Sequence, residues 1–286
     1  MLSYYKGKPI AIIKGGARDG CELGLYDPSK KCCEKCKGKC SKRRGFCCET
    51  CIADKCYKGA SNERSTMSEM VMLKGDGSKF EPLPNCETTF GERGMVCGPT
   101  GSGKSTYASN YAKQYKKMFP NNKIIIFSGV KEDKVLDKLD PIRIEINESL
   151  INDPMQKEEL NNSLCIFDDI ETIRPTSLKK AVHELLIHVQ KEGRKQNIYV
   201  LLCSHQFTRG VETRDISNES NYITFFPSSG SRYGITYYLN KYVGIPNDTI
   251  RRIMKLPSRW VTVYKTYPMY VLYETGCFLL SNMEEE

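Results

Sequence analysis

The stretch "GMVCGPTGSGKST", residues 94–106, decides the class of fold. It contains the Walker A spacing, with Gly98 followed after four residues by Gly103, Lys104 and Ser105. An apolar run typical of a strand precedes it, and a helical pattern follows it. Glycines let successive backbone N–H groups point at a phosphate, and the start of a helix adds its dipole. The sequence therefore predicts a phosphate-binding loop.

Within this loop we expect Lys104 to bind the β- and γ-phosphates of ATP and Ser105 to place its hydroxyl on Mg²⁺. The predicted nucleotide-binding residues are Gly98, Pro99, Thr100, Gly101, Ser102, Gly103, Lys104, Ser105 and Thr106. The loop alone does not fix the reaction, because nucleotide kinases, GTPases and motor ATPases share it.

Around the loop, short apolar runs alternate with helical patterns. The runs that predict strands are RGMVCG, KIIIFSG, PIRIEI, SLCIFDD, NIYVLLCS and NYITFF. The clearest helix, TSLKKAVHELLIHVQKEGRK, carries an apolar stripe wide enough to cover a sheet face. The pattern predicts an α/β fold, a P-loop NTPase of the ASCE/RecA-like type with a mostly parallel sheet flanked by helices. WVTVYK, YVLYE and CFLL predict extra C-terminal strands, antiparallel at an edge.

Two adjacent acids follow the apolar run SLCIF. Asp168 would lie at the strand's carboxyl edge beside the phosphates, where it would hold Mg²⁺ together with Ser105. We expect the next carboxylate, Asp169, to orient and polarise the attacking water. An aspartate is one methylene shorter than the more usual glutamate, so Glu171 is an alternative base. The structural alternative is an acid pair that caps the following helix.

The run NIYVLLCS is followed by Ser204, His205 and Gln206. A polar amide at the carboxyl edge of that strand can sense the γ-phosphate and hold the water, and we assign this role to Gln206. The simpler alternative is an ordinary loop residue at a strand end.

GPTGSGKST, then CIFDDIE, then GRKQNIYVLLCSHQ, in this order and spacing, resembles the FtsK/HerA superfamily of DNA-pumping ATPases, and specifically the genome-packaging ATPases of poxviruses and other large DNA viruses. The resemblance covers roughly residues 80 to 260. It implies a homo-oligomeric ring that threads double-stranded DNA by ATP hydrolysis, with a capsid or portal-vertex protein as a partner. Two alternatives stay open: a helicase or recombination-type ATPase, and a zinc-bearing nucleic-acid-binding protein that uses nucleotide as a switch.

The resemblance also implies an arginine that reaches the γ-phosphate of a neighbouring subunit. The matching position is Arg194, in GRKQ, and Arg209 and Arg214 are rivals for this role or for contacts with DNA. A guanidinium stabilises charge on the transferring phosphoryl group. The chain departs from the family pattern at Asp169, in place of glutamate, and in a cysteine-rich front segment.

That segment holds most of the cysteine. Nine of the fourteen cysteines lie between Cys21 and Cys56, and two CxxC pairs recur in a near-repeat. Eight thiolates suffice for two tetrahedral Zn²⁺ sites. The predicted zinc ligands are Cys32, Cys33, Cys36, Cys40, Cys47, Cys48, Cys51 and Cys56. The alternatives are disulfides, which some virus particles accumulate, an iron–sulfur cluster, and a reactive or disordered tail.

Charge follows the same division. Residues 1–60 hold 14 Lys/Arg against 6 Asp/Glu, whereas residues 61–286 hold 29 against 28. We therefore expect a basic cysteine-rich module over residues 1–65, able to grip DNA or a capsid protein, and a P-loop ATPase domain over residues 66–286. No apolar run is long enough for a bilayer. We expect a soluble protein of the host-cell cytoplasm or a viral factory, with association with the virion as a further expectation.

Overall fold

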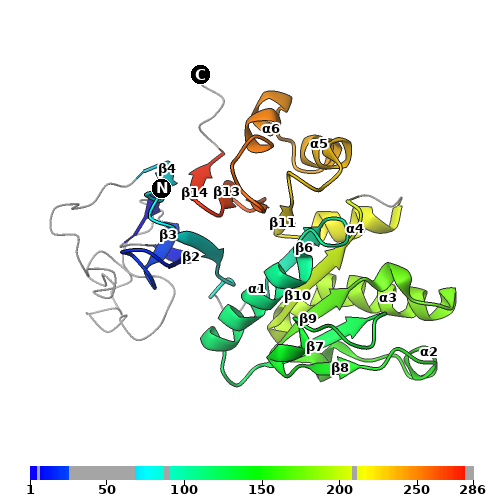
Figure 1. Cartoon of the computed structure of the whole chain (residues 1–286). Coiled ribbons are helices and arrows are strands. Elements are labelled where there is room, and N and C mark those ends of the chain that lie inside the picture. Colours follow the sequence, from blue (N-terminus) through cyan, green and yellow to red (C-terminus); the bar gives the residue numbers. More distant parts are fainter. Residues whose placement is uncertain (5–6, 26–67, 87–90, 208–210, 281–286) are drawn as a thin grey trace. The chain divides into compact units, whose positions relative to one another are not determined.

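The computed structural model describes residues 1–4, 7–25, 68–86, 91–207 and 211–280, and side chains within these ranges except at 211–214. Two compact units result, each built from its own strands (Figure 1). One unit comprises Met1–Glu87 with Tyr267–Glu286, and the other comprises Thr88–Thr266.

The larger unit contains seven neighbouring strands of the ten-stranded sheet, in the order β12-β11-β6-β10-β9-β7-β8. All neighbouring pairs among these seven strands are parallel except β11 with β12, which is antiparallel. The strands are β6 (Arg93–Cys97), β7 (Lys123–Ser128), β8 (Ile142–Ile144), β9 (Ser163–Asp168), β10 (Ile198–Ser204), β11 (Tyr222–Phe225) and β12 (Val261–Tyr264). Every run predicted as a strand of this unit forms one.

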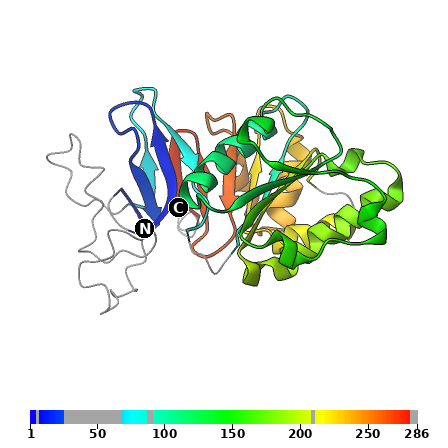
Figure 2. The same ribbon diagram turned by 90° about the horizontal axis from the view of Figure 1, so that it is seen from below.

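Helices lie on both faces of this sheet (Figures 1 and 2). The crossover from β6 to β7 and the crossover from β9 to β10 run in opposite directions across the sheet, so right-handed connections put their helices on opposite faces. The helices of this unit are α1 (Lys104–Met118), α2 (Ser149–Asn152), α3 (Thr176–Glu192), α4 (Val211–Glu219), α5 (Arg232–Lys241) and α6 (Asn247–Ile253). Short 3₁₀ turns are η3 (Asp137–Leu139), η4 (Lys157–Leu160), η5 (Ile170–Thr172) and η6 (Gly193–Gln196).

The core of this unit is densest around β10, in which all seven residues are buried. On α3, the predicted apolar stripe supplies the buried residues Leu178, Val182, Leu186 and Val189. At one central position of the sheet, the ring of Tyr222 in β11 packs so closely against β6 that only glycine fits. A Cβ added at Gly94 in β6 would lie 2.1 Å from the ring of Tyr222, which is itself fully buried. The α/β fold predicted from the sequence is confirmed.

The smaller unit is antiparallel. One sheet has the order β1-β3-β2-β5, and a second group of strands has the order β4-β14-β13. The strands are β1 (Leu2–Ser3), β2 (Lys8–Lys14), β3 (Glu22–Leu25), β4 (Met70–Met72), β5 (Lys79–Pro82), β13 (Tyr270–Tyr273) and β14 (Gly276–Leu279). The β13–β14 hairpin turns at Glu274 and Thr275, the two residues between the strands.

The division between the units differs from the predicted boundary between residues 65 and 66. The reason is strand pairing over a long sequence separation. Ala11 in β2 lies opposite Pro82 in β5, so residues beyond 66 belong with the start of the chain. In the same way Cys277 in β14 pairs with Val71 in β4. The predicted zinc-binding cysteines fall in residues 26–67, outside the described residues, between β3 and β4 in the chain.

Candidate nucleotide site

Three neighbouring parallel strands end together at one edge of the larger sheet. The register pairs Cys97, the last residue of β6, with Ser204, the last residue of β10. It also pairs Asp168, the last residue of β9, with Cys203. Consequently the phosphate-binding loop begins next to the residues that follow Ser204, and these in turn lie next to the acid pair.

The loop itself has the shape of a cradle. A Cβ added at Gly98 would lie 2.5 Å from Ser102 Oγ and 2.7 Å from the ring of Phe226, so only glycine fits. Gly103 has a φ of 112°, in the left-handed region that favours glycine, immediately before α1 begins at Lys104. Ser102 Oγ is buried and has no hydrogen-bond partner among the described residues. A backbone cradle with a spare hydroxyl at a helix start fits an oxyanion.

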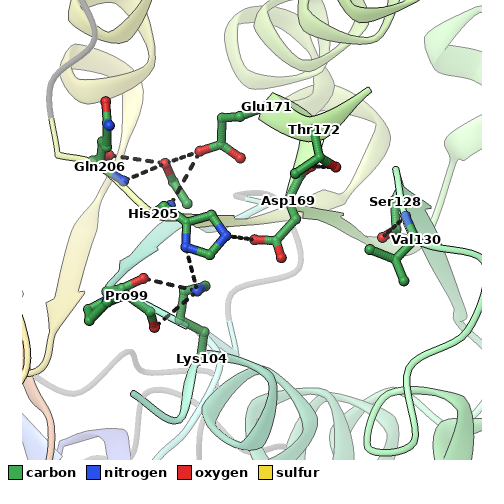
Figure 3. A network of polar contacts seen from close by, with 11 residues as sticks. Pro99, Lys104, Ser128, Val130, Asp169, Glu171, Thr172, His205 and Gln206 are labelled. Carbon is green, nitrogen blue, oxygen red and sulfur yellow. Dashed lines mark hydrogen bonds and ion pairs between the residues drawn. The ribbon is translucent and has the colours of Figure 1, made fainter. Parts of the chain in front are cut away.

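Lys104 reaches across this cradle. Its side chain is buried, and Nζ donates to the carbonyl oxygens of Gly98 at 2.9 Å and Pro99 at 3.4 Å. The same Nζ lies 3.4 Å from Nδ1 of His205 (Figure 3). Backbone carbonyls therefore hold the ammonium group at the mouth of the cradle, where an incoming phosphate would meet it.

His205 connects Lys104 to Asp169. Its Nε2 lies 2.9 Å from Asp169 Oδ1, on the side of the ring opposite Lys104 (Figure 3). A neutral ring with the proton on Nε2 is compatible with both contacts, because Nδ1 then accepts from the ammonium and the Nε2–H side of the ring lies next to the carboxylate. Asp169 itself has a φ of 48°, a left-handed turn that follows β9 directly. The ring thus links the loop lysine to the predicted base.

Glu171, the alternative base, is tied to the end of β10. Its Oε1 accepts from the hydroxyl of Ser204 and, at 3.3 Å, from the backbone N–H of His205. Oε2 is buried and has no hydrogen-bond partner among the described residues. Glu171 therefore anchors η5 to β10 through one oxygen, whereas Asp169 faces the ring that contacts Lys104.

Gln206, the predicted sensor, takes part through its backbone. Its N–H donates to Ser204 Oγ at 3.2 Å and its carbonyl oxygen accepts from the same hydroxyl at 3.0 Å. The exposed side chain points away from Lys104 (Figure 3). The neighbouring His205 occupies the position that we assigned to the amide. The sequence placed both residues after a buried strand, but it could not show which of them turns toward the loop.

Asp168 is the most perturbed acid of the site. Burial, followed by the nearby charges of Asp169 and Asp133, raises its pKa from 3.8 to about 7, despite the opposing effect of Lys104. A divalent cation would offset this unfavourable negative charge, so Asp168 and Ser105, near the start of α1, fit the predicted Mg²⁺. No group of three or more acid, His or Cys side chains is arranged as a metal site in the described part of the chain. Mg²⁺ needs none, because it is usually held by one or two carboxylates, water and phosphate oxygens.

Of the three candidate arginines, Arg194 is fully described, and it lies away from this network. Arg194 is exposed in η6, before β10 begins, at the amino edge of the sheet. Because β10 has seven residues at about 3.3 Å each, roughly 20 Å separates it from the site at the other edge. Arg209 falls outside the described residues, and Arg214 lies in α4 where only the backbone is described.

Comparison with known proteins identifies one relative of substantial identity. The chain is 39% identical over 230 residues to the uncharacterized protein V3 of Sputnik virophage, which covers 79% of this chain and 92% of that protein. No family model matches the chain. Among the described residues, no helix is both long enough and apolar enough to span a bilayer.

Solved structures show a weaker likeness. The genome-packaging NTPase B204 of Sulfolobus turreted icosahedral virus 2, in complex with AMPPCP, is similar over 64% of this chain and 97% of its own, at 11% identity and a TM-score of 0.43. The cytoplasmic domain of the Thermomonospora curvata type VII secretion ATPase EccC is similar over 65% of this chain, at 15% identity and a TM-score of 0.44. The chain spans only 25% of that EccC structure.

Asp168→Asn should stabilise the protein without nucleotide at high pH. The folded state holds the Asp168 proton up to about pH 7, whereas the unfolded chain releases it near pH 4. The contribution of Asp168 to the free energy of unfolding is therefore fully present below pH 4 and is lost as the pH rises through 7. We expect the variant to gain about 1–3 kcal/mol at pH 8 and little at pH 4.5 in thermal or urea unfolding. The exposed Asp153→Asn is the control, and an equal change at both pH values contradicts this view.

Asp169→Asn and Glu171→Gln should separate the two candidate bases. We expect Asp169→Asn to bind ATP with Mg²⁺ but to hydrolyse it at least about 100-fold more slowly, since a lost general base removes that much. Glu171→Gln keeps an oxygen acceptor for Ser204, so its rate of ATP hydrolysis should fall less than about tenfold. Its unfolding temperature should be lower than that of the wild type. Single-turnover hydrolysis measures the first effect and calorimetry the second. The opposite pattern would make Glu171 the base.

Proposed function

The chain belongs to the same family as protein V3 of Sputnik virophage, and we propose that it is an ATPase that translocates double-stranded DNA into a viral capsid. The observation that carries the catalytic part is the contact series from Lys104 through His205 to Asp169, beside Asp168. A phosphate-binding cation, a metal-binding carboxylate and a water-orienting carboxylate thereby share one edge of the sheet.

In the proposed reaction, the loop N–H groups and Lys104 bind the β- and γ-phosphates of ATP. Ser105 and Asp168 would hold Mg²⁺, which would neutralise negative charge that develops on the phosphate groups. Asp169 orients the attacking water and polarises it. The contact with His205 keeps the Asp169 carboxylate pointing toward the loop, so His205 is a positioning residue. Because the ring also touches Lys104, it can respond to whether the lysine is bound to a phosphate.

The proposed arginine finger needs a second subunit. Arg194 lies at the opposite edge of the sheet from its own loop, so it cannot reach a nucleotide bound by the same chain. In a ring, the exposed amino edge of one subunit can face the nucleotide site of the next. The position of Arg194 therefore supports action between subunits and makes the oligomer part of the active site.

The DNA-pumping part of the proposal is supported by the order of the motifs. Walker A, the Asp-Asp pair, and the Gly-Arg turn that leads into the strand ending in His-Gln occur together in this sequence. The relative in a virophage supports a viral setting. A capsid or portal-vertex protein is the proposed partner that receives the DNA.

The rate of ATP hydrolysis, measured with and without linear duplex DNA, tests the proposal. We expect hydrolysis that duplex DNA stimulates several-fold, and loss of nearly all turnover in Lys104→Ala, which lacks the cation of the cradle. ATP binding with negligible hydrolysis in the presence of DNA would instead indicate a nucleotide switch. Strand separation of a forked substrate without movement along duplex DNA would indicate a helicase.

Mixing subunits tests the finger. Arg194→Ala should lower the rate of DNA-stimulated ATP hydrolysis by about 10³-fold, because Arg194 is proposed to stabilise the transition state in the neighbouring subunit. When Arg194→Ala and Lys104→Ala are mixed, some interfaces pair an intact loop with an intact finger, so activity should partly return. Absence of any recovery, with both variants assembled to the wild-type mass, contradicts a finger supplied by the neighbouring subunit.

A further inference from the structure

A strongly basic surface lies on helices that the proposed nucleotide site does not use. Residues 231–260 contain six Lys/Arg and one acid, whereas residues 61–286 as a whole hold 29 Lys/Arg and 28 acids. This excess therefore belongs to α5, α6 and the segment that follows them. We define the α5–α6 surface by the residues Tyr233, Tyr237, Lys241, Arg251, Arg252 and Lys255, all exposed.

On α5, the outer face carries two aromatic rings and a cation. Tyr233 is 80% exposed and Tyr237 is 40% exposed, and their rings are stacked with centroids 6.2 Å apart. Lys241 follows four residues later, so the three side chains lie along one side of the helix. Large exposed rings are unusual on a surface that only faces water. Tyrosine hydroxyls and lysine ammonium groups both bind phosphate oxygens.

On α6, which packs against α5, the cations come from the last turn and the residues after it. Arg251 pairs with Asp248 at 2.8 Å, and Arg252 and Lys255 are exposed without an ion pair in the described part of the chain. Asp248 is the one acid of residues 231–260, so most of the positive charge is not balanced locally. A polyanion is the complementary partner of such a surface.

The buried face of α5 contacts the nucleotide site. Tyr238 on that face lies 6.1 Å, centroid to centroid, from Phe207, which directly follows His205 and Gln206. Phe207 also packs edge-on against Phe225 at the end of β11. The next residue, Phe226, lines the phosphate cradle at Gly98. A displacement of α5 can therefore be transmitted through packed aromatic side chains to the phosphate cradle.

We propose that the α5–α6 surface binds the phosphate backbone of double-stranded DNA and transmits that contact to the nucleotide site through Tyr238 and Phe207. This inference rests on the proposed function as a DNA-stimulated ATPase and names where the DNA is held. Phosphate contacts of this kind carry no sequence information, which suits an enzyme that moves along any duplex.

The test compares two triple variants of the full chain that each remove three positive charges. Arg251→Gln, Arg252→Gln and Lys255→Gln change the α5–α6 surface. Lys74→Gln, Lys113→Gln and Lys180→Gln, exposed on elements outside the α5–α6 surface and the nucleotide site, form the matched control. The probes are a fluorescently labelled 30-base-pair duplex in anisotropy titrations from 0.05 to about 0.2 M salt, and ATP hydrolysis with and without that duplex.

We expect the surface variant to bind duplex about tenfold or more weakly near 0.15 M salt, with the slope of log K against log salt reduced by about 2–3. Stimulation by DNA should be lost, while hydrolysis without DNA stays within about twofold of wild type. The control should bind and respond like wild type. Tyr233→Ala with Tyr237→Ala should also lower the stimulation.

Three outcomes would overturn the inference. If the surface variant keeps wild-type affinity and stimulation, DNA is held elsewhere and the proposed function still stands. If the control loses as much as the surface variant, the effect is one of net charge alone. If wild-type protein neither binds duplex nor responds to it, both the inference and the proposed DNA-pumping function fail.

Discussion

The register of β10 between β6 and β9 is the constraint on which the site depends. β10 is buried along its whole length, and its partners pair with it residue by residue. A shift of one residue would turn every side chain to the opposite face and move Ser204 away from Cys97. The register therefore fixes where the loop, the acid pair and His205 begin. The polar chemistry at the edge is positioned by apolar packing in the middle of the sheet.

Charge at that edge is unbalanced in a way that suits a cation. Asp168, Asp169 and Glu171 lie within four residues of one another, and Lys104 is the cation that touches the network. Burial, and after it the neighbouring negative charges, raises the pKa of Asp168. Lys104 is itself held by carbonyl oxygens of its own loop, so an entering phosphate replaces contacts that already exist. A divalent cation bound beside Asp168 would offset the negative charge of the acids and of an entering phosphate.

Much of this arrangement could be predicted from the sequence, because the signals are local. The strand runs, the amphipathic α3 and the glycine loop each depend on neighbours within a few residues, and the structure contains them. The division of the chain could not be predicted, because β2 pairs with β5 about seventy residues later, beyond the cysteine-rich segment. Composition changes sharply near residue 60, but strand pairing does not follow composition.

The roles of His205 and Gln206 show a different limit of sequence analysis. Both residues follow the same buried strand, and successive side chains there point in opposite directions. Which of them turns toward Lys104 depends on how the chain leaves β10. Ser204 decides this, because its hydroxyl contacts both backbone groups of Gln206 and the carboxylate of Glu171. These contacts cross between β10 and η5, and no periodic pattern in the sequence reveals them.

β10 also connects the three parts of the proposed motor. Arg194 lies just before its amino end, His205 just after its carboxyl end, and Phe207 two residues further on packs against α5. A fully buried strand in a parallel sheet is stiff, so a small displacement at one end is carried to the other. In the proposed motor, this one strand would couple the contact of α5 with DNA to the state of the nucleotide and to the placement of the finger in a neighbour. The coupling needs no large rearrangement, because each of the three contacts is attached to the same strand.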